Sequence, residues 1–335
     1  MKTKVIITVD TEFSIAGAFQ DPENFKPIGL PAVLCEKNGH SHGLGFLLDV
    51  LNQYDLKATF FVEALNSNYF GYELMGNIAH HIIERGQDVQ LHLHPCWQYF
   101  KNKNWKDQLE LNPPNDNICT RTLQEIESIL LEGIDVFCNW DLPRPIAIRT
   151  GSLCVNRNVY KAMASTGIKF SSNIGVGIFK PLEDELTLYS GCHEIESCYE
   201  LPVLTYSDFN ISRKKHLKLL TITGSNWEEI EYLLLDAAKT KMDYVVILTH
   251  PFEYIKNKNQ QYNNISENRP NKKRLISLCE FLRKQIEIFS VTTFSELQSS
   301  KIITNNKANT LLEVPVYSAI KRMFENYAND KIDPL

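Results

Sequence analysis

The sequence lacks any apolar run long enough to span a membrane, and it lacks an excess of basic residues. Its 335 residues include 35 Lys and Arg against 40 Asp and Glu, for a formal net charge of −5. Because a nucleic-acid-binding surface requires an excess of cations, this balance argues against nucleic acid as a partner. The apolar segment at residues 5–9 is too short for a signal peptide, so we expect a cytoplasmic protein with no transmembrane segment.

Paired cysteines and nucleotide-binding motifs are also missing. The eight cysteines are scattered, and no two of them form a C-x-x-C pair. Without an export signal we expect free thiols rather than a disulfide framework. No G-x-G-x-x-G follows an expected strand, and the P-loop pattern G-x-x-x-x-G-K-[ST] does not occur. These absences count against the nucleotide-binding folds.

What is present is an alternation of short apolar strands with amphipathic helices. The pattern predicts strands at residues 5–10, 57–62, 89–94, 145–149, 168–172, 244–250 and 289–292, with a short one at 201–204. It predicts helices at residues 45–54, 72–85, 122–137, 156–166, 226–239 and 271–286. Repeated strand–helix units favour a parallel sheet covered by helices. The expected fold class is therefore α/β, a distorted (β/α)7-type barrel. A doubly wound open sheet is the alternative.

The chain divides into a barrel domain at residues 1–298 and a C-terminal tail at residues 299–335. Pro315 is suited to the first turn of a helix in this tail. One face of that helix would carry an apolar stripe of Val316, Ala319, Ile320, Met323, Phe324 and Tyr327. We expect this amphipathic helix to pack on the outside of the barrel. A contact with a membrane or a partner is the alternative.

The most informative stretch is Q-L-H-L-H-P at residues 90–95. Because alternate side chains of a strand share a face, its two histidines project together. The D-T-E at residues 10–12 places two carboxylates in the same relation at the end of the first expected strand. The carboxyl ends of the strands form the face where barrel enzymes build their active sites. The residues expected to meet there are Asp10, Glu12, His92, His94, Arg149 and His250.

Two imidazoles and a carboxylate are a suitable ligand set for a zinc-like divalent ion with one position open to water. Strand parity assigns Glu12 to the metal and leaves Asp10 as the general base. Asp10 remains the alternative acidic ligand. Arg149 would keep Asp10 ionised and oriented. His250 would protonate the leaving amine.

These segments resemble motifs of the polysaccharide deacetylase (NodB-homology) family, in order over residues 3–298. The matching pieces are T-V-D-T-E (8–12), K-A-T-F-F-V (57–62), G-Q-D-V-Q-L-H-L-H-P (86–95), R-T-G-S (149–152), I-L-T-H (247–250) and F-S-V-T-T-F-S-E-L (289–297). The resemblance implies a distorted barrel and metal-dependent hydrolysis of an N-acetyl group on an amino sugar. D-T-E and H-L-H-P are most similar to the WalW-like branch, which implies a surface-polysaccharide or O-antigen precursor. The substrate would be nucleotide-linked, lipid-linked or an oligosaccharide.

By this resemblance the base is Asp10, the metal ligands include both histidines, Arg149 orients the base and His250 is the general acid. The chain departs from the family pattern because Thr11 replaces a second Asp and only Leu93 separates the histidines. The fourth family motif is best matched by E-L-P-V at residues 200–203, and the sequence assigns no acidic partner to His250. Two alternatives therefore stay open: hydrolysis of another amide, such as a cyclic one, and an inactive carbohydrate-binding member.

Overall fold

The structure is a computed structural model, and it describes residues 2–211, 214–300, 302–304 and 309–331. Its centre is a nine-stranded, curled and mostly parallel sheet in the order β12-β1-β4-β5-β6-β7-β9-β8, with β15 also paired to β1. The strands are β1 (Thr3–Thr11), β4 (Thr59–Glu63), β5 (Asp88–Leu93), β6 (Ala147–Thr150), β7 (Phe170–Ser171), β8 (His193–Ile195), β9 (Cys198–Glu200), β12 (Tyr244–Thr249) and β15 (Phe289–Val291). This half-barrel confirms the expected α/β barrel class.

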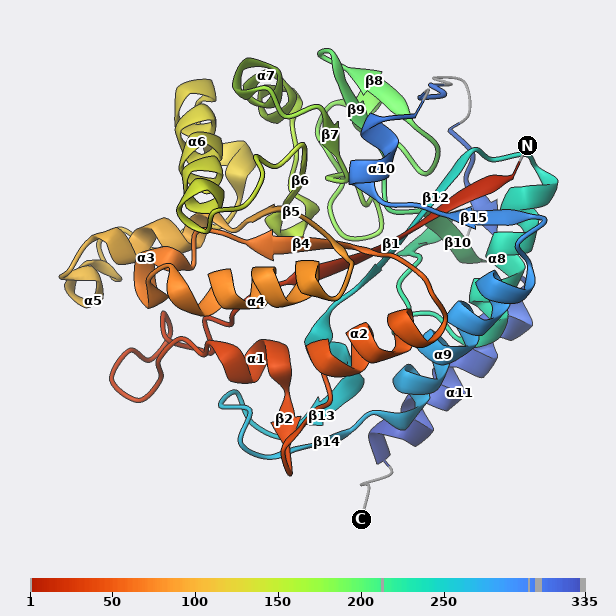
Figure 1. The fold of residues 1–335 in the computed structure, drawn as a ribbon, viewed down its shortest axis with the longest axis horizontal. Helices are drawn as coiled ribbons and strands as arrows, with labels where there is room; N and C mark the ends of the chain where they lie inside the picture. The colour runs from red at the N-terminus through yellow and green to blue at the C-terminus, as the bar shows by residue number, and fades with distance from the viewer. Residues whose placement is uncertain (1, 212–213, 301, 305–308, 332–335) are drawn as a thin grey trace.

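Helices cover the outside of the sheet (Figure 1). The six expected helices form within two residues of their predicted bounds: α2 (Leu44–Gln53), α4 (Glu73–Glu84), α6 (Leu123–Asn139), α7 (Arg157–Thr166), α8 (Trp227–Lys239) and α9 (Arg269–Lys284). Capping boxes begin α6, at Thr122 and Glu125, and α8, at Asn226 and Glu229. Shorter helices are α1 (Leu30–Leu34), α3 (Ser67–Phe70), α5 (Trp105–Gln108) and α10 (Phe294–Gln298).

The alternation along β1 separates two cores. Val5, Ile7 and Val9 pack outward with the covering helices. Ile6 belongs to a smaller cluster inside the curl, where Phe294 of α10 lies 5.5 Å from the ring of Phe61. Because side chains alternate along a strand, the residues that follow Ile6 on the inner face are polar and lead toward the carboxyl end of the sheet.

Several small strands lie outside the expected pattern. β10 (Thr205–Ile211), β11 (Lys214–Leu219) and β16 (Leu312–Glu313) form a second sheet. Two hairpins join β2 (Glu36–Lys37) to β3 (His40–Ser41) and β13 (Ile255–Asn257) to β14 (Ile265–Glu267). No strand forms at residues 201–204, where only Val203 makes an isolated bridge, to Val246. The prediction of a strand there was wrong. The segment is the connection between β9, which ends at Glu200, and β10, which begins at Thr205.

The C-terminal helix α11 (Val316–Lys331) packs against α8 and β10, but most of its apolar stripe lies on the opposite side. Its buried residues are Ser318, Ala319 and Arg322. The other members of the expected stripe are exposed: Val316, Ile320, Met323, Phe324 and Tyr327. The helix therefore packs on the rest of the chain as expected, but the prediction that its apolar stripe makes the contact was wrong for all members except Ala319, since a buried arginine occupies the inner face instead.

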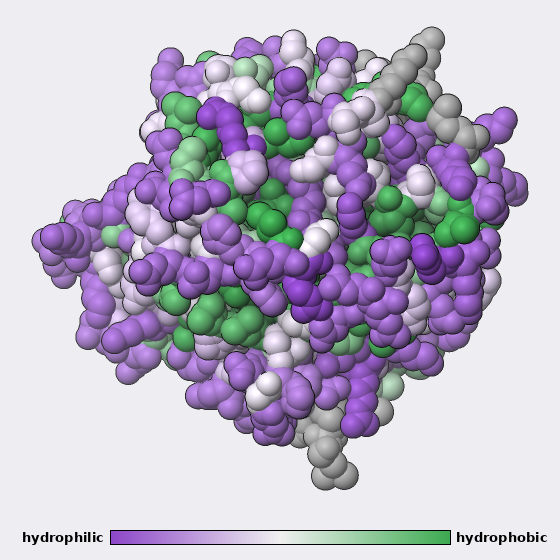
Figure 2. All heavy atoms as spheres, viewed as in Figure 1, coloured by the Kyte–Doolittle hydropathy of each residue, from purple (hydrophilic) through white to green (hydrophobic). Residues whose placement is uncertain are grey.

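The face drawn in Figure 2 is mostly hydrophilic, and hydrophobic residues show there in small areas between polar ones. Among the described residues, no helix combines the length and the apolar character needed to cross a bilayer.

Candidate metal centre

The three predicted metal ligands lie together where β1 and β5 end. The Nε2 atom of His94 is 2.7 Å from Oε2 of Glu12, and Nε2 of His92 is 3.4 Å from the same oxygen. One ligand atom from each residue lies within 4.8 Å of the other two. Tetrahedral ligands about 2.1 Å from a zinc ion are roughly 3.4 Å apart. The His92–Glu12 distance equals this spacing, whereas the 2.7 Å contact between His94 and Glu12 is a hydrogen bond that would lengthen around an ion.

The Nδ1 atom of each of the two histidines makes a hydrogen bond to another part of the chain. Nδ1 of His92 donates to the carbonyl oxygen of Arg149 at 2.8 Å, and Nδ1 of His94 donates to Oδ2 of Asp116 at 2.6 Å. Such partners fix the ring orientation and the tautomer of metal-ligating histidines. Both rings are thereby held with Nε2 directed at Glu12. The donor set fits a divalent ion.

The charges at this cluster agree with a cation-binding role. Burial by itself would raise the pKa of Glu12, but His94 and His92 hold the pKa of this carboxyl well below its usual range. Burial by itself would lower the pKa of His94, but Glu12 and Asp116 raise it well above its usual value. Two carboxylates therefore surround His94 and stabilise positive charge at this position.

Asp10 is held by a buried arginine. Nη1 of Arg149 donates to Oδ1 of Asp10 at 2.7 Å and to the hydroxyl of Thr8 at 2.9 Å. Nε and Nη2 of the same guanidinium donate to the carbonyl and hydroxyl oxygens of Ser172, and its centre lies 4.5 Å from the ring of Phe61. Since Arg149 is fully buried, these bonds fix both its orientation and that of the carboxylate.

His250 faces Asp10 from the end of β12. Its Nε2 is 3.9 Å from Oδ2 of Asp10, and its Nδ1 is 3.1 Å from Oε1 of Glu253. Thr249 donates a further hydrogen bond to Glu253. Burial by itself would lower the pKa of His250, but Glu253 outweighs burial and raises this pKa to about 9. The histidine is therefore protonated at neutral pH, as a general acid must be.

Sequence reasoning missed three carboxylates at this site. Glu253 is the acidic partner of His250, and its signal was H-P-F-E, a capping pattern in which the fourth residue bonds back to the first. Asp116 comes from an irregular segment 22 residues after His94, where no pattern marks it. Glu63 ends β4 beside His92 in the sheet register, and burial raises its pKa well above the usual range.

The fourth-motif candidate lies elsewhere. Glu200 accepts hydrogen bonds from Ser171, from the hydroxyl of Tyr160 and from the backbone N–H groups of Asn173 and Ile174. It therefore holds the segment that carries Ser172, the partner of Arg149, and none of these bonds reaches the metal ligands.

A cavity of about 280 Å³ opens over the centre. Glu12, His94 and Asp116 contribute its polar wall. Its remaining lining is largely apolar and includes Phe13, Ile15, Trp97, Phe252 and Tyr262. The cavity combines a few converging polar groups with apolar walls, as small-molecule sites do.

No protein-family model matches the chain, and no curated protein matches it. Solved structures do match. A candidate polysaccharide deacetylase from Mycobacterium smegmatis aligns over 91% of this chain and 94% of that chain, at 14% sequence identity and a TM-score of 0.53. The chain has the polysaccharide deacetylase fold. This agrees with the curled parallel half-barrel and with the order of the sequence motifs.

Two weaker matches carry related names. A family 4 carbohydrate esterase from Streptomyces lividans, solved with acetate, aligns over 90% of this chain and 97% of that chain at 11% identity and a TM-score of 0.44. A mutant of a family 4 pseudoenzyme with restored enzymatic activity aligns over 90% of this chain and 70% of that chain at 13% identity and a TM-score of 0.45.

Proposed function

We propose that the protein is a metal-dependent carbohydrate N-deacetylase that hydrolyses the N-acetyl group of an amino sugar. The observation that carries the proposal is the meeting of Glu12, His92 and His94 beside an Asp10 held by Arg149. In the proposal these residues provide a cation site and a separate, oriented carboxylate, the two parts that metal-assisted hydrolysis of an amide uses. The polysaccharide deacetylase fold supports the same assignment.

In this proposal Glu12, His92 and His94 hold a divalent ion, for which zinc is the first choice. When bound, such an ion supplies Lewis acidity that polarises the acetyl carbonyl and eases ionisation of water. Asp116 and the Arg149 carbonyl keep the two imidazoles oriented through their Nδ1 hydrogen bonds.

The chain's own residues move the protons. Asp10 takes a proton from the attacking water, and the bonds from Arg149 hold its carboxylate in position for this. His250, charged through its pair with Glu253, gives a proton to the sugar nitrogen as the C–N bond breaks. The products are acetate and the free amine.

We further propose that the substrate is a surface-polysaccharide or O-antigen precursor, in keeping with the sequence resemblance to the WalW-like branch. Nucleotide-linked, lipid-linked and oligosaccharide forms all remain part of this proposal. The division into a catalytic unit at residues 1–298 and a tail at residues 299–335 also stays a proposal.

The test is acetate release from nucleotide-linked and lipid-linked N-acetylhexosamines and from chito-oligosaccharides, with bound metal measured in parallel. Asp10→Asn should lower kcat by about 10²- to 10⁴-fold, the usual contribution of a general base, with metal content unchanged. Asp49→Asn, the same change at an exposed residue of α2, should leave kcat unaltered.

Unaltered activity of Asp10→Asn, or full activity in metal-free protein, would reject the mechanism. If the protein hydrolysed cyclic amides and released no acetate from the sugars, the alternative activity on a cyclic amide would replace the proposed deacetylase activity. If the protein bound glycans tightly but turned none over, it would be an inactive carbohydrate-binding member of the family instead.

A further inference from the structure

Helix α11 presents an apolar face to solvent. Its exposed residues are Val316 (55% exposed), Tyr317 (67%), Ile320 (50%), Met323 (61%), Phe324 (70%) and Tyr327 (65%). Six side chains of this size expose on the order of 700 Å² of surface, above the roughly 300–600 Å² of the largest apolar patch on a typical monomer. A patch of this extent marks an interaction surface.

The orientation of the helix is fixed by ion pairs on its other side. Arg322 is 5% exposed, and its guanidinium bonds to Asp208 and Glu229, both of them buried. Turning the apolar face inward would break both pairs and leave two buried carboxylates without their cation. The apolar face is therefore held outward.

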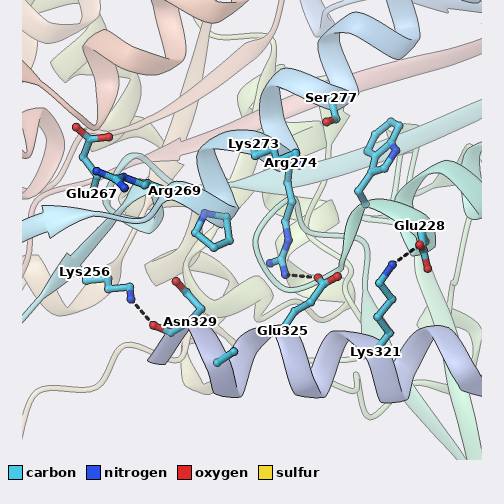
Figure 3. Close-up of a pocket in the computed structure, with 13 residues that line it drawn as sticks. Glu228, Lys256, Glu267, Arg269, Lys273, Arg274, Ser277, Lys321, Glu325 and Asn329 are labelled. Carbon is cyan, nitrogen blue, oxygen red and sulfur yellow. Dashed lines mark hydrogen bonds and ion pairs between the residues drawn. The ribbon is translucent and has the colours of Figure 1, made fainter. Parts of the chain in front are cut away.

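One flank of α11 is tied down as well (Figure 3). Glu325 pairs with Arg274 of α9 at 3.4 Å, and Lys321 pairs with Glu228 of α8. The carbonyl of Asn329 accepts a bond from Lys256. These contacts line a cavity of about 690 Å³ between α9 and α11. They engage the flank of the helix and leave its apolar face free.

The spacing of the exposed residues matches a helix–helix seam. Val316, Ile320, Met323 and Tyr327 follow steps of four, three and four residues, the alternation found along coiled-coil seams. Tyr317 and Phe324 widen the seam on one side. A face of this kind is completed by another helix.

We propose that this partner is α11 of a second copy of the chain, packed antiparallel across a twofold axis near the middle of the helix. In this arrangement Val316 faces Tyr327 of the other copy and Ile320 faces Met323, so the seam complements itself. Complete burial of about 700 Å² from each copy sets an upper limit of roughly 1,400 Å² in total, which reaches the range of specific interfaces.

Charge at the ends of the seam is complementary in the same arrangement. Lys331 at the C-terminal end lies on the apolar side of α11, next to the Tyr327 ring. The antiparallel partner would place its β16 residue Glu313, half exposed and paired with Lys215, beside this lysine. Symmetry repeats the contact at both ends of the interface.

A membrane surface fits less well. Helices that lie in an anionic bilayer interface carry many Lys and Arg beside the apolar face. On α11 the exposed or half-exposed cations Lys321 and Lys331 are balanced by Glu325 and Asp330. The net charge of −5 also opposes attraction to anionic lipids.

Sedimentation velocity of the full chain tests the proposal, over roughly 1 to 100 µM to cover the affinity range of interfaces of this size. We expect a dimer. Changing both Ile320→Asp and Phe324→Asp should raise the dimer Kd by at least about 100-fold, because charge replaces buried apolar area. Both positions are exposed in the monomer, so the fold should persist, which circular dichroism checks. Leu131→Asp, the same change at an exposed leucine of α6, should leave Kd unchanged.

A charge exchange tests the antiparallel direction. Glu313→Lys and Lys331→Glu should each weaken the dimer by about 3- to 10-fold, since each change affects two symmetric pairs. The double exchange should recover most of this loss. Two weakening single changes without recovery would overturn the antiparallel arrangement.

A chain that stays monomeric throughout the concentration range would overturn the proposal. So would a dimer that persists in the Ile320→Asp, Phe324→Asp double variant. A monomer that co-sediments with vesicles of phosphatidylcholine and phosphatidylglycerol would assign the apolar face to a bilayer instead.

Discussion

Individual residues at this centre are positioned by partners far away in the sequence. Arg149 reaches Asp10 across 139 residues, and the same guanidinium is held by Ser172. Removing one partner of a buried ion pair leaves an uncompensated charge, which is why such contacts define orientation strongly. The proposed base therefore owes its geometry to β6 and the segment after β7 as much as to β1.

The Glu253–His250 pair gives a pH prediction. A general acid works only while protonated, so activity should fall as pH rises through the pKa of His250, which Glu253 raises to about 9. Glu253→Gln removes this raising charge. The alkaline limb of the kcat profile should then move to lower pH, by about one to three units.

Profiles of kcat against pH for the unsubstituted protein and for Glu253→Gln measure this shift of the alkaline limb. Glu84→Gln, an equivalent change at an exposed residue of α4, should leave the limb in place. A limb that does not move in Glu253→Gln would show that His250 does not act as the acid.

At the scale of elements, the centre depends on where strands end. Glu12 and His94 each follow directly after the last residue of β1 and β5, and His250 follows directly after β12. Parallel pairing brings these carboxyl ends to one side of the sheet. The short 3₁₀ turn after His250, Pro251–Tyr254, then returns Glu253 to the histidine.

Helix α11 supplies a stability prediction. Arg322→Ala leaves Asp208 and Glu229 buried without their cation and should lower the free energy of unfolding by about 3–5 kcal/mol. Lys321→Ala removes only a surface ion pair from the same helix and should change stability little.

Urea denaturation measures both changes, and hydrogen exchange shows whether α11 is released first. If the two variants were equally stable, the ion pairs of Arg322 would not be what anchors the helix.

For the whole molecule, the proposed cation site would link metal binding to stability. An ion that binds only the folded chain should stabilise it by about 2.7 kcal/mol at a free concentration 100 times its Kd. Zinc should therefore raise Tm, and a chelator should reverse the rise. Asp116→Asn should weaken zinc binding by about 10- to 100-fold, because it weakens the hydrogen bond that orients the His94 ring.

Thermal denaturation with and without zinc, together with titration calorimetry, tests this. His94→Ala should abolish the rise in Tm, and His81→Ala on the exposed side of α4 should retain it. A rise in Tm that survives His94→Ala would place the ion elsewhere.

Much of the fold could be predicted from local patterns. Seven expected strands and six expected helices form, because periods of two and 3.6 residues encode which face is buried within each segment. The same parity placed Asp10 and the two histidines on the inner side of the sheet. The β10–β11 hairpin was missed because its strand Lys214–Leu219 is rich in lysine and has no continuous apolar face.

The sequence by itself determined seven strands of the central sheet, the six long helices that cover it, their order, and the strand ends at which Glu12, His92 and His94 lie. Only the tertiary structure decided that Asp116 bonds to His94, that Glu253 pairs with His250 and that α11 turns Arg322 inward. The physical reason is the separation along the chain over which each kind of interaction acts. Hydrophobic periodicity acts within a segment, whereas hydrogen bonds and ion pairs depend on distances between segments that become neighbours only after folding.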